Sequence, residues 1–241
     1  MKKKSILKLV PICVLCIALV CTFIFKLSGE NQNSAPEENE PVQRPTTIEM
    51  TDALFIGDSR TVGLMEYADI KGAEFFSDVG MSVYNIYDQK VSVPGVGKVK
   101  LVELLENKKY GKIYVMLGIN EVGYKFDRTV SRYNALLEMI GAKQPEASLF
   151  IQANLHVTKA RSDKDKVVNN KAINVLNKKL SRLADNKRIF YMDSNVIFDD
   201  DEGNLSAEKS EDNSHLYAKY YSEWGKWIIR ETAMLVGEVK G

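Results

Sequence analysis

Short apolar runs alternate with segments of helical periodicity along most of this chain, and this alternation restricts the possible folds more than any other feature. The runs have the length of buried strands, and the first three end directly before a glycine. Strands that alternate with amphipathic helices form β-α-β units, so the sequence predicts an α/β fold with a parallel sheet covered by helices on both faces. The five predicted strands are Ala53–Ile56, Glu74–Val79, Lys112–Leu117, Leu149–Ala153 and Ile189–Met192.

The segments between these strands carry apolar residues three or four positions apart, the spacing of one buried helix face. The last segment also contains a row of aromatic residues, which we interpret as core packing. The predicted faces are Val99, Val102 and Leu105; Val130, Tyr133, Leu137 and Ile140; Ile173, Leu176, Leu180 and Leu183; and Tyr217, Tyr220, Trp224, Trp227, Ile228 and Leu235.

The first 27 residues differ from everything that follows. Four lysines precede the uncharged 17-residue run Leu9–Phe25, and about 17 apolar residues can just span a bilayer. Lysines before such a run stay in the cytoplasm, so the rest of the chain is expected outside it. Residues 1–27 are therefore predicted to be a single-pass membrane anchor. The alternative is a signal peptide whose cleavage would release a secreted protein, but no A-x-A cleavage pattern is present.

Residues 28–48 are rich in Glu, Asn, Pro and Ser and are predicted to form a disordered linker, which leaves 49–241 as the folded domain. From residue 27 onward the formal charge is 28 − 32 = −4, so nucleic acid is not an expected partner. All three cysteines lie within the first 21 residues. The domain therefore has no disulfide framework, no thiolate metal site and no cysteine nucleophile, and we predict no cofactor and no metal.

Polar residues follow the predicted strands, at the sheet edge where ligands bind in such folds. Gly57-Asp58-Ser59-Arg60 follows the first strand. A glycine there allows a sharp turn that presents the Ser59 hydroxyl and N–H at the edge. By itself the motif equally fits an ordinary helix cap by Asp58 or Ser59.

Gly80 and Asn120 follow the second and third predicted strands. The Gly80 N–H and the Asn120 amide could both bind an oxyanion, although each residue alone also fits a turn or a cap. Asp212 and His215 lie three apart before the last helix, so the carboxylate can orient one imidazole nitrogen and leave the other free to accept a proton. The alternative is that Asp212 or Ser214 caps that helix and His215 is incidental.

The order Gly-Asp-Ser, Gly, Gly-x-Asn and Asp-x-x-His resembles the SGNH (GDSL-like) hydrolase superfamily over residues 52–235, and FIGDSRT resembles a group of bacterial membrane-anchored members. The resemblance implies a flavodoxin-like, three-layer α/β/α sandwich with five parallel strands. It also implies that Ser59 is the nucleophile, His215 the general base and Asp212 its partner. Ser59, Gly80 and Asn120 would form the oxyanion hole.

Three residues depart from the family pattern: Arg60 replaces a leucine, Glu121 an aspartate and Asn213 a glycine. Arg60 either contacts the substrate or forms an internal salt bridge. His156 follows the fourth predicted strand, where it either contacts the substrate or has a structural role. The acidic run at 199–202 does not have the spacing of an EF-hand loop and is interpreted as a solvated loop.

The sequence thus predicts an extracytoplasmic serine esterase that hydrolyses small acyl esters, such as acetyl esters on cell-envelope or dietary carbohydrates. One alternative is an O-acyltransferase that uses the same triad to modify envelope glycans. Another is a catalytically idle, membrane-tethered carbohydrate-binding module. The expected partners are a small-molecule or carbohydrate ester and, through the N-terminal helix, the membrane.

Overall fold

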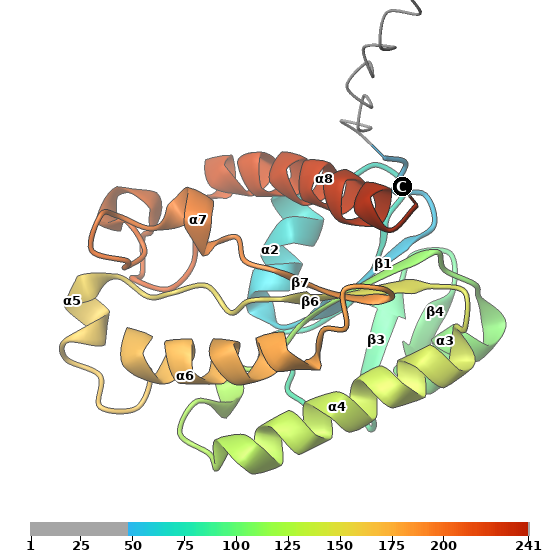
Figure 1. Ribbon diagram of the computed structural model, residues 1–241, viewed down its shortest axis with the longest axis horizontal. Coiled ribbons are helices and arrows are strands. Elements are labelled where there is room, and N and C mark those ends of the chain that lie inside the picture. Colours follow the sequence, from blue (N-terminus) through green and yellow to red (C-terminus); the bar gives the residue numbers. More distant parts are fainter. Residues whose placement is uncertain (1–47, 241) are drawn as a thin grey trace, which may run out of the picture. The chain divides into compact units, whose positions relative to one another are not determined.

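The computed structural model describes residues 48–240, and these form a parallel sheet with helices on both faces (Figure 1). The main sheet consists of β1 (Ala53–Gly57), β2 (Glu74–Ser77), β5 (Lys112–Met116), β6 (Ser148–Gln152) and β7 (Ile189–Met192). The longer helices are α2 (Ser59–Tyr67), α3 (Leu101–Asn107), α4 (Phe126–Lys143), α6 (Asn170–Leu180) and α8 (Ala218–Lys240). Short helices complete the chain: η1 (Ile119–Glu121), α5 (Lys159–Ser162), η2 (Ser181–Leu183), α7 (Asn195–Phe198) and η3 (Ala207–Lys209).

The five strands are parallel and lie in the order β2-β1-β5-β6-β7. Alternate residues of β1 point to opposite faces, so Leu54 and Ile56 belong to one hydrophobic cluster and Phe55 to another. The first cluster packs under α3, α4 and α6, and the second under α2 and α8, as Figure 1 shows. The predicted three-layer α/β/α sandwich with five parallel strands is therefore confirmed.

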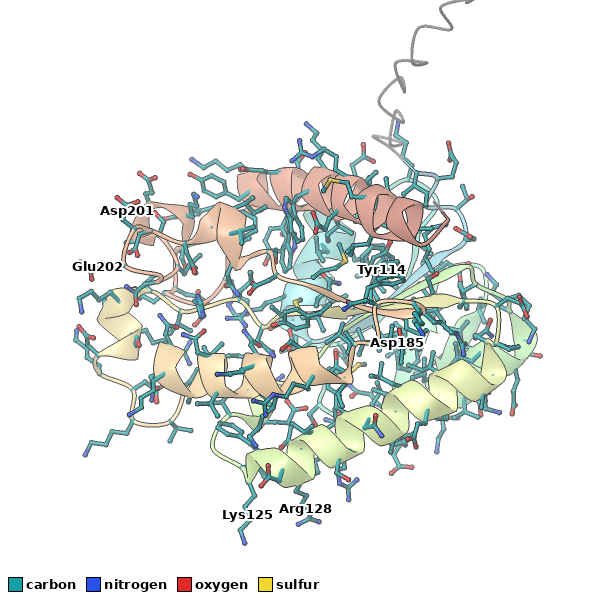
Figure 2. All side chains as sticks on the ribbon, viewed as in Figure 1. Tyr114, Lys125, Arg128, Asp185, Asp201 and Glu202 are labelled. Carbon is teal, nitrogen blue, oxygen red and sulfur yellow. The ribbon has the colours of Figure 1, made fainter. Side chains whose placement is uncertain are left out.

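A row of stacked aromatic rings crosses all five strands on the α8 face of the sheet. Neighbouring ring centroids lie 4.4–5.4 Å apart, within the range of favourable aromatic pairs. The central ring, Tyr114, also bonds through its hydroxyl to Thr232 of α8 at 2.8 Å, and Figure 2 shows it beneath that helix. The row therefore ties the strand register to the covering helix. Its members are Phe75, Phe55, Tyr114, Phe150 and Phe190.

The sequence analysis missed a hairpin. β3 (Lys90–Val93) and β4 (Gly97–Lys100) pair as an antiparallel ribbon outside the main sheet. Val99 lies in β4 and not on a helix face, and α3 instead buries Leu101, Leu104 and Leu105. The helix begins later than predicted because the chain remains extended through Lys100, whose backbone N–H donates to the Glu103 carboxylate at 2.9 Å.

The predicted anchor at 1–27 and almost all of the predicted linker at 28–48 lie outside the described residues. Within residues 48–240, no helix combines the length and the apolar character needed to cross a bilayer. The predicted anchor and its alternative, a cleaved signal peptide, therefore both stay predictions.

Gly57 occupies the last position of β1, immediately before the turn that carries Ser59, and it has no room for a side chain. A Cβ atom there would collide with the Thr61 hydroxyl and would lie 2.7 Å from the Met116 carbonyl oxygen of β5. The glycine is thus required by the close approach of the turn to the neighbouring strand.

We expect Gly57→Ala to lower the free energy of unfolding by about 1–3 kcal/mol, because the added methyl group must displace the backbone of a neighbouring strand. Urea denaturation of the full-length protein measures the change. The matched control is Gly141→Ala in α4, where an added Cβ would lie 3.6 Å from its nearest neighbour, in Arg188. That variant should gain about 0.5–1 kcal/mol from the better helix propensity of alanine. Equal effects of the two substitutions would contradict the steric explanation.

Candidate active site

Ser59, His215 and Asp212 form a continuous hydrogen-bonded chain, as expected for a catalytic triad. The Ser59 hydroxyl lies 2.9 Å from Nε2 of His215, and Nδ1 of His215 lies 2.6 Å from a carboxylate oxygen of Asp212. The other Asp212 oxygen accepts the backbone N–H groups of Ser214 and His215. One carboxylate therefore both shapes the loop and orients the imidazole.

The electrostatic setting of Asp212 keeps it ionised. Its partial burial would raise its pKa, but the hydrogen bonds from His215 and Ser214 outweigh that effect and lower the pKa to about 2. A permanently charged partner can stabilise the imidazolium that forms when His215 accepts a proton. Asn213 lies between Asp212 and His215 and has a φ of 69°. Asparagine tolerates this left-handed conformation, which glycine also adopts easily.

Ser59 is the first residue of α2, and Asp58 caps that helix by accepting the Arg60 N–H at 3.0 Å. The capping interpretation and the nucleophile interpretation are therefore compatible, because Asp58 caps while the Ser59 hydroxyl reaches His215. As the first helical residue, Ser59 also has a backbone N–H without an intrahelical acceptor. That N–H is available to an anion.

Arg60 is 2% exposed, and neither a salt bridge of Arg60 within residues 48–240 nor a substrate contact is seen, so both predicted alternatives stay without direct support. Its Nη2 donates to the carbonyl oxygen of Ser214 at 3.1 Å, and Ser214 directly precedes His215 in the sequence. Burial lowers its pKa and raises that of Asp58, and each charge counteracts the shift of the other. Arg60 therefore supports the segment 212–215 that carries Asp212 and His215, referred to below as the catalytic loop, and it offers little surface to a substrate.

The loop after β2 approaches Asn120. Nδ2 of Asn120 donates to the Met81 carbonyl oxygen at 2.9 Å, which leaves one amide hydrogen for another acceptor. Gly80 precedes Met81 in a left-handed conformation with φ 76°. Asn120 and Ser59 both line the catalytic depression, a hollow of about 150 Å³. Gly80 is exposed, and it does not line that hollow.

Glu121, which the sequence analysis recorded only as a departure from the family pattern, is fully buried beneath this loop. Its Oε1 accepts the Val83 N–H at 2.7 Å, and its Oε2 has no hydrogen-bond partner among the described residues. Burial, with the charge of Asp58 adding to it, raises the pKa of Glu121 to about 7. Glu121 and Asn120 are adjacent in η1, so this one turn holds the Met81–Val83 segment at two points.

His156 has a structural environment, the second of its two predicted alternatives. It is 7% exposed, and its ring nitrogens lie 2.7 Å from an Asp199 oxygen and 2.8 Å from the Asn174 amide oxygen. Burial alone would lower its pKa, but these two partners outweigh it and raise the pKa. The imidazole thus joins α6 to the loop after α7, with no nitrogen left for a substrate.

The same contact corrects the interpretation of residues 199–202 as a wholly solvated loop. Asp199 is largely buried against His156, whereas Asp201 and Glu202 point outward from the domain (Figure 2). Within the described part of the chain, no group of three or more His, Cys, Asp or Glu side chains could hold a metal ion.

Comparison with solved structures identifies the architecture. A GDSL-like lipase from Bacteroides thetaiotaomicron is 14% identical with a TM-score of 0.58, and the match covers 79% of this chain and 91% of that one. An acetyl xylan esterase is also 14% identical, with a TM-score of 0.53 over 73% and 96% of the two chains. A carbohydrate acetylesterase from Sinorhizobium meliloti is 13% identical, with a TM-score of 0.50 over 76% and 98%. The chain has the SGNH hydrolase fold. No family profile and no curated protein matches its sequence.

Within this SGNH fold, the catalytic depression brings together Ser59, Arg60, Asn120 and His215, four of the predicted site residues. It also contains Ser214, which the sequence analysis considered only as a possible helix cap, and Arg161, which it did not single out. Arg161 follows the fourth main strand in no recognisable motif, so nothing in the sequence distinguished it from surface arginines.

We expect Glu121→Gln to change how stability depends on pH. A carboxyl group whose pKa rises from 4.5 to about 7 on folding stabilises the fold most at low pH. That stability is lost as the pH rises from the lower value to the higher. The glutamine at position 121 cannot titrate. The free energy of unfolding of the variant minus that of wild type should therefore increase across this pH range and stay constant above it.

Urea denaturation at several pH values between about 5 and 8 measures this difference. Glu146→Gln, which removes an exposed carboxylate, serves as the control and should show no such trend. A constant difference between Glu121→Gln and wild type would show that Glu121 does not titrate in this range.

Proposed function

We propose that this chain is a serine esterase that cleaves small acyl esters, in particular acetyl esters of carbohydrates. The observation that carries the proposal is the Ser59–His215–Asp212 chain, with distances of 2.9 and 2.6 Å, at the edge of an SGNH-fold sheet. The known proteins with this fold include GDSL-like lipases and acetyl esterases of carbohydrates, which supports the same class of substrate here.

In the proposed reaction, Nε2 of His215 takes the Ser59 proton while the Ser59 oxygen attacks the ester carbonyl carbon. The charge that develops on the carbonyl oxygen is bound by the N–H group of Ser59 and by the free amide hydrogen of Asn120, which both line the depression, while the Gly80 N–H stays a predicted third donor. His215 then gives its proton to the alcohol oxygen as that bond breaks, which leaves an acyl group on Ser59. A water molecule, deprotonated by His215, releases the acid and restores the hydroxyl.

The small size of the catalytic depression supports a small acyl group. Its volume is about 150 Å³, well below the 300–1,000 Å³ typical of sites for drug-sized ligands. Ile119 and Val168 are the aliphatic residues that line it. An acetyl group matches a site with this little apolar surface better than a long acyl chain does.

Ser59→Ala should abolish covalent labelling by a fluorophosphonate and lower the rate of acetyl ester hydrolysis by about 10⁴-fold or more, because it removes the nucleophile. The measurements are labelling of the full-length protein and hydrolysis of 4-nitrophenyl acetate. Ser222→Ala changes a partly buried serine of α8 outside the depression and should behave like wild type. Turnover near the wild-type rate in Ser59→Ala would rule out the serine mechanism.

We also propose that the esterase domain lies outside the cytoplasm, tethered by residues 1–27 or secreted after their removal. The support is the sequence of that segment, four lysines before 17 uncharged residues. Protease added to intact cells that express the protein should therefore digest the domain. Digestion only after lysis would place it inside and contradict the proposal.

A further inference from the structure

A second, larger depression lies next to the catalytic one, since Arg161 lines both. The larger one has a volume of about 660 Å³. Its residues come from the segment 160–167, which contains the end of α5, and from the catalytic loop. They are Ala160, Arg161, Lys164, Asp165, Lys166, Val167, Asp212 and Asn213. A ligand that reaches Ser59 can therefore extend over this segment without leaving the surface.

Arg161 is held beside the catalytic histidine. Its Nη1 donates to the Ser214 hydroxyl, one residue before His215, and its Nε lies 3.7 Å from Asp165. Thr158, the cap of α5, bonds to Asn213 through both its hydroxyl and its N–H. The Arg161 side chain is still 35% exposed, and its contacts with the described residues use Nη1 and Nε but not Nη2. Arg161 is thus a fixed cation that keeps one donor nitrogen for a ligand.

The charges around the larger depression are not balanced by its own carboxylates. Asp212 is committed to His215 and to two backbone N–H groups. Asp165 accepts the N–H groups of Val167 and Val168, which are the main cause of its lowered pKa. Lys164 and Lys166 are exposed and have no ion-pair partner within residues 48–240. The lining thus carries three cations against two carboxylates, a formal charge of 3 − 2 = +1, on a domain whose sequence is net acidic from residue 27 onward.

The position of these cations indicates which half of the ester they would meet. The larger depression is bounded by Asp212 and Asn213, on the histidine side of the nucleophile. His215 must protonate the departing alcohol, so the alcohol half of an ester lies on that side. The acyl half lies toward the oxyanion donors, and Asn120 lines the smaller depression. An anion on Arg161 would therefore belong to the alcohol.

We propose that Arg161, Lys164 and Lys166 form an anion subsite for the alcohol half of the substrate. The substrate is then an acyl ester of an anionic alcohol, such as a polyol or sugar that carries a phosphate or a carboxylate. Guanidinium and ammonium groups bind both kinds of oxyanion through charge-assisted hydrogen bonds. This inference rests on the proposed esterase function and specifies its substrate class.

The test compares four acetate esters of small alcohols with the full-length protein: neutral glycerol 1-acetate, 1-acetyl-glycerol 3-phosphate, 3-acetyl-glycerate and the cationic ester acetylcholine. We expect kcat/KM for at least one anionic ester to exceed that for glycerol acetate by about tenfold, the effect of one charge-assisted contact. Acetylcholine should be the poorest substrate. The phosphate and carboxylate esters show which anion the subsite prefers. The preference should shrink at high salt, because the lysines are exposed.

Variants separate binding of the anion from support of the catalytic loop. The double variant Lys164→Gln/Lys166→Gln should lose about threefold or more of the preference for the anionic ester while its rate on glycerol acetate is unchanged. Arg161→Gln should lose the preference almost entirely. The matched control is Lys159→Gln in α5, since Lys159 pairs with Asp163 and lines neither depression. Its preference should equal that of wild type.

The outcomes distinguish the two proposals. Hydrolysis of none of the acetates, the neutral one included, would contradict the esterase function itself. Equal rates on neutral and anionic esters would contradict the anion subsite and leave the esterase function intact. An equal loss on every ester in Arg161→Gln, with no effect of the double lysine variant, would show that Arg161 only positions Ser214, which would overturn the subsite.

Discussion

The row of aromatic rings across the sheet fixes the geometry on which the active site depends. Each ring stacks on the residue directly opposite in the next strand, so Phe55 faces both Phe75 and Tyr114. A shift of one residue in any strand would turn its ring to the other face and break the row. The register therefore aligns the carboxyl ends of β1 and β5, and these ends carry Ser59 and Asn120. The chain order reverses between the same two strands, which is where ligands bind in doubly wound sheets.

Three ionisable side chains lie buried immediately beneath this edge, where burial of their charged forms costs free energy. Asp58, Arg60 and Glu121 are each at most 2% exposed, and each has one polar atom without a hydrogen-bond partner in the described structure. Buried groups of this kind cost free energy unless they are paired. Each also makes one contact with the site: Asp58 caps the helix of Ser59, Arg60 holds the Ser214 carbonyl, and Glu121 holds the Val83 N–H. The buried groups that cost free energy are therefore the same groups that position the candidate site.

Features that depend on neighbouring residues could be predicted from the sequence, and those that depend on distant contacts could not. Asp212 and His215 lie three positions apart in one loop, so their spacing alone indicated the contact that the structure contains. Glu121 follows the exposed Asn120, and only the approach of the β2 loop, which places Val83 against it, makes it a buried group. The β3–β4 ribbon was missed because two four-residue strands with alternating polarity give a weak signal. Arg161 reaches Ser214 only because α5 packs beside the catalytic loop, a contact between segments that are distant in sequence.

Two guanidinium groups, which come from different helices, donate hydrogen bonds to the same residue of the catalytic loop. Arg60 donates to the Ser214 carbonyl oxygen and Arg161 to its hydroxyl, so the residue before His215 is held from α2 and from α5. Two cations beside the base oppose the positive charge that His215 acquires when it accepts the Ser59 proton. Asp212 offsets them directly through its contact with Nδ1 of His215. Burial raises the pKa of Asp58, and the charge of Arg60 beside it lowers that pKa in part. The acidic residue of the Gly-Asp-Ser motif is thus both the cap that begins the helix of Ser59 and the opposite charge beside the buried guanidinium that holds the Ser214 carbonyl.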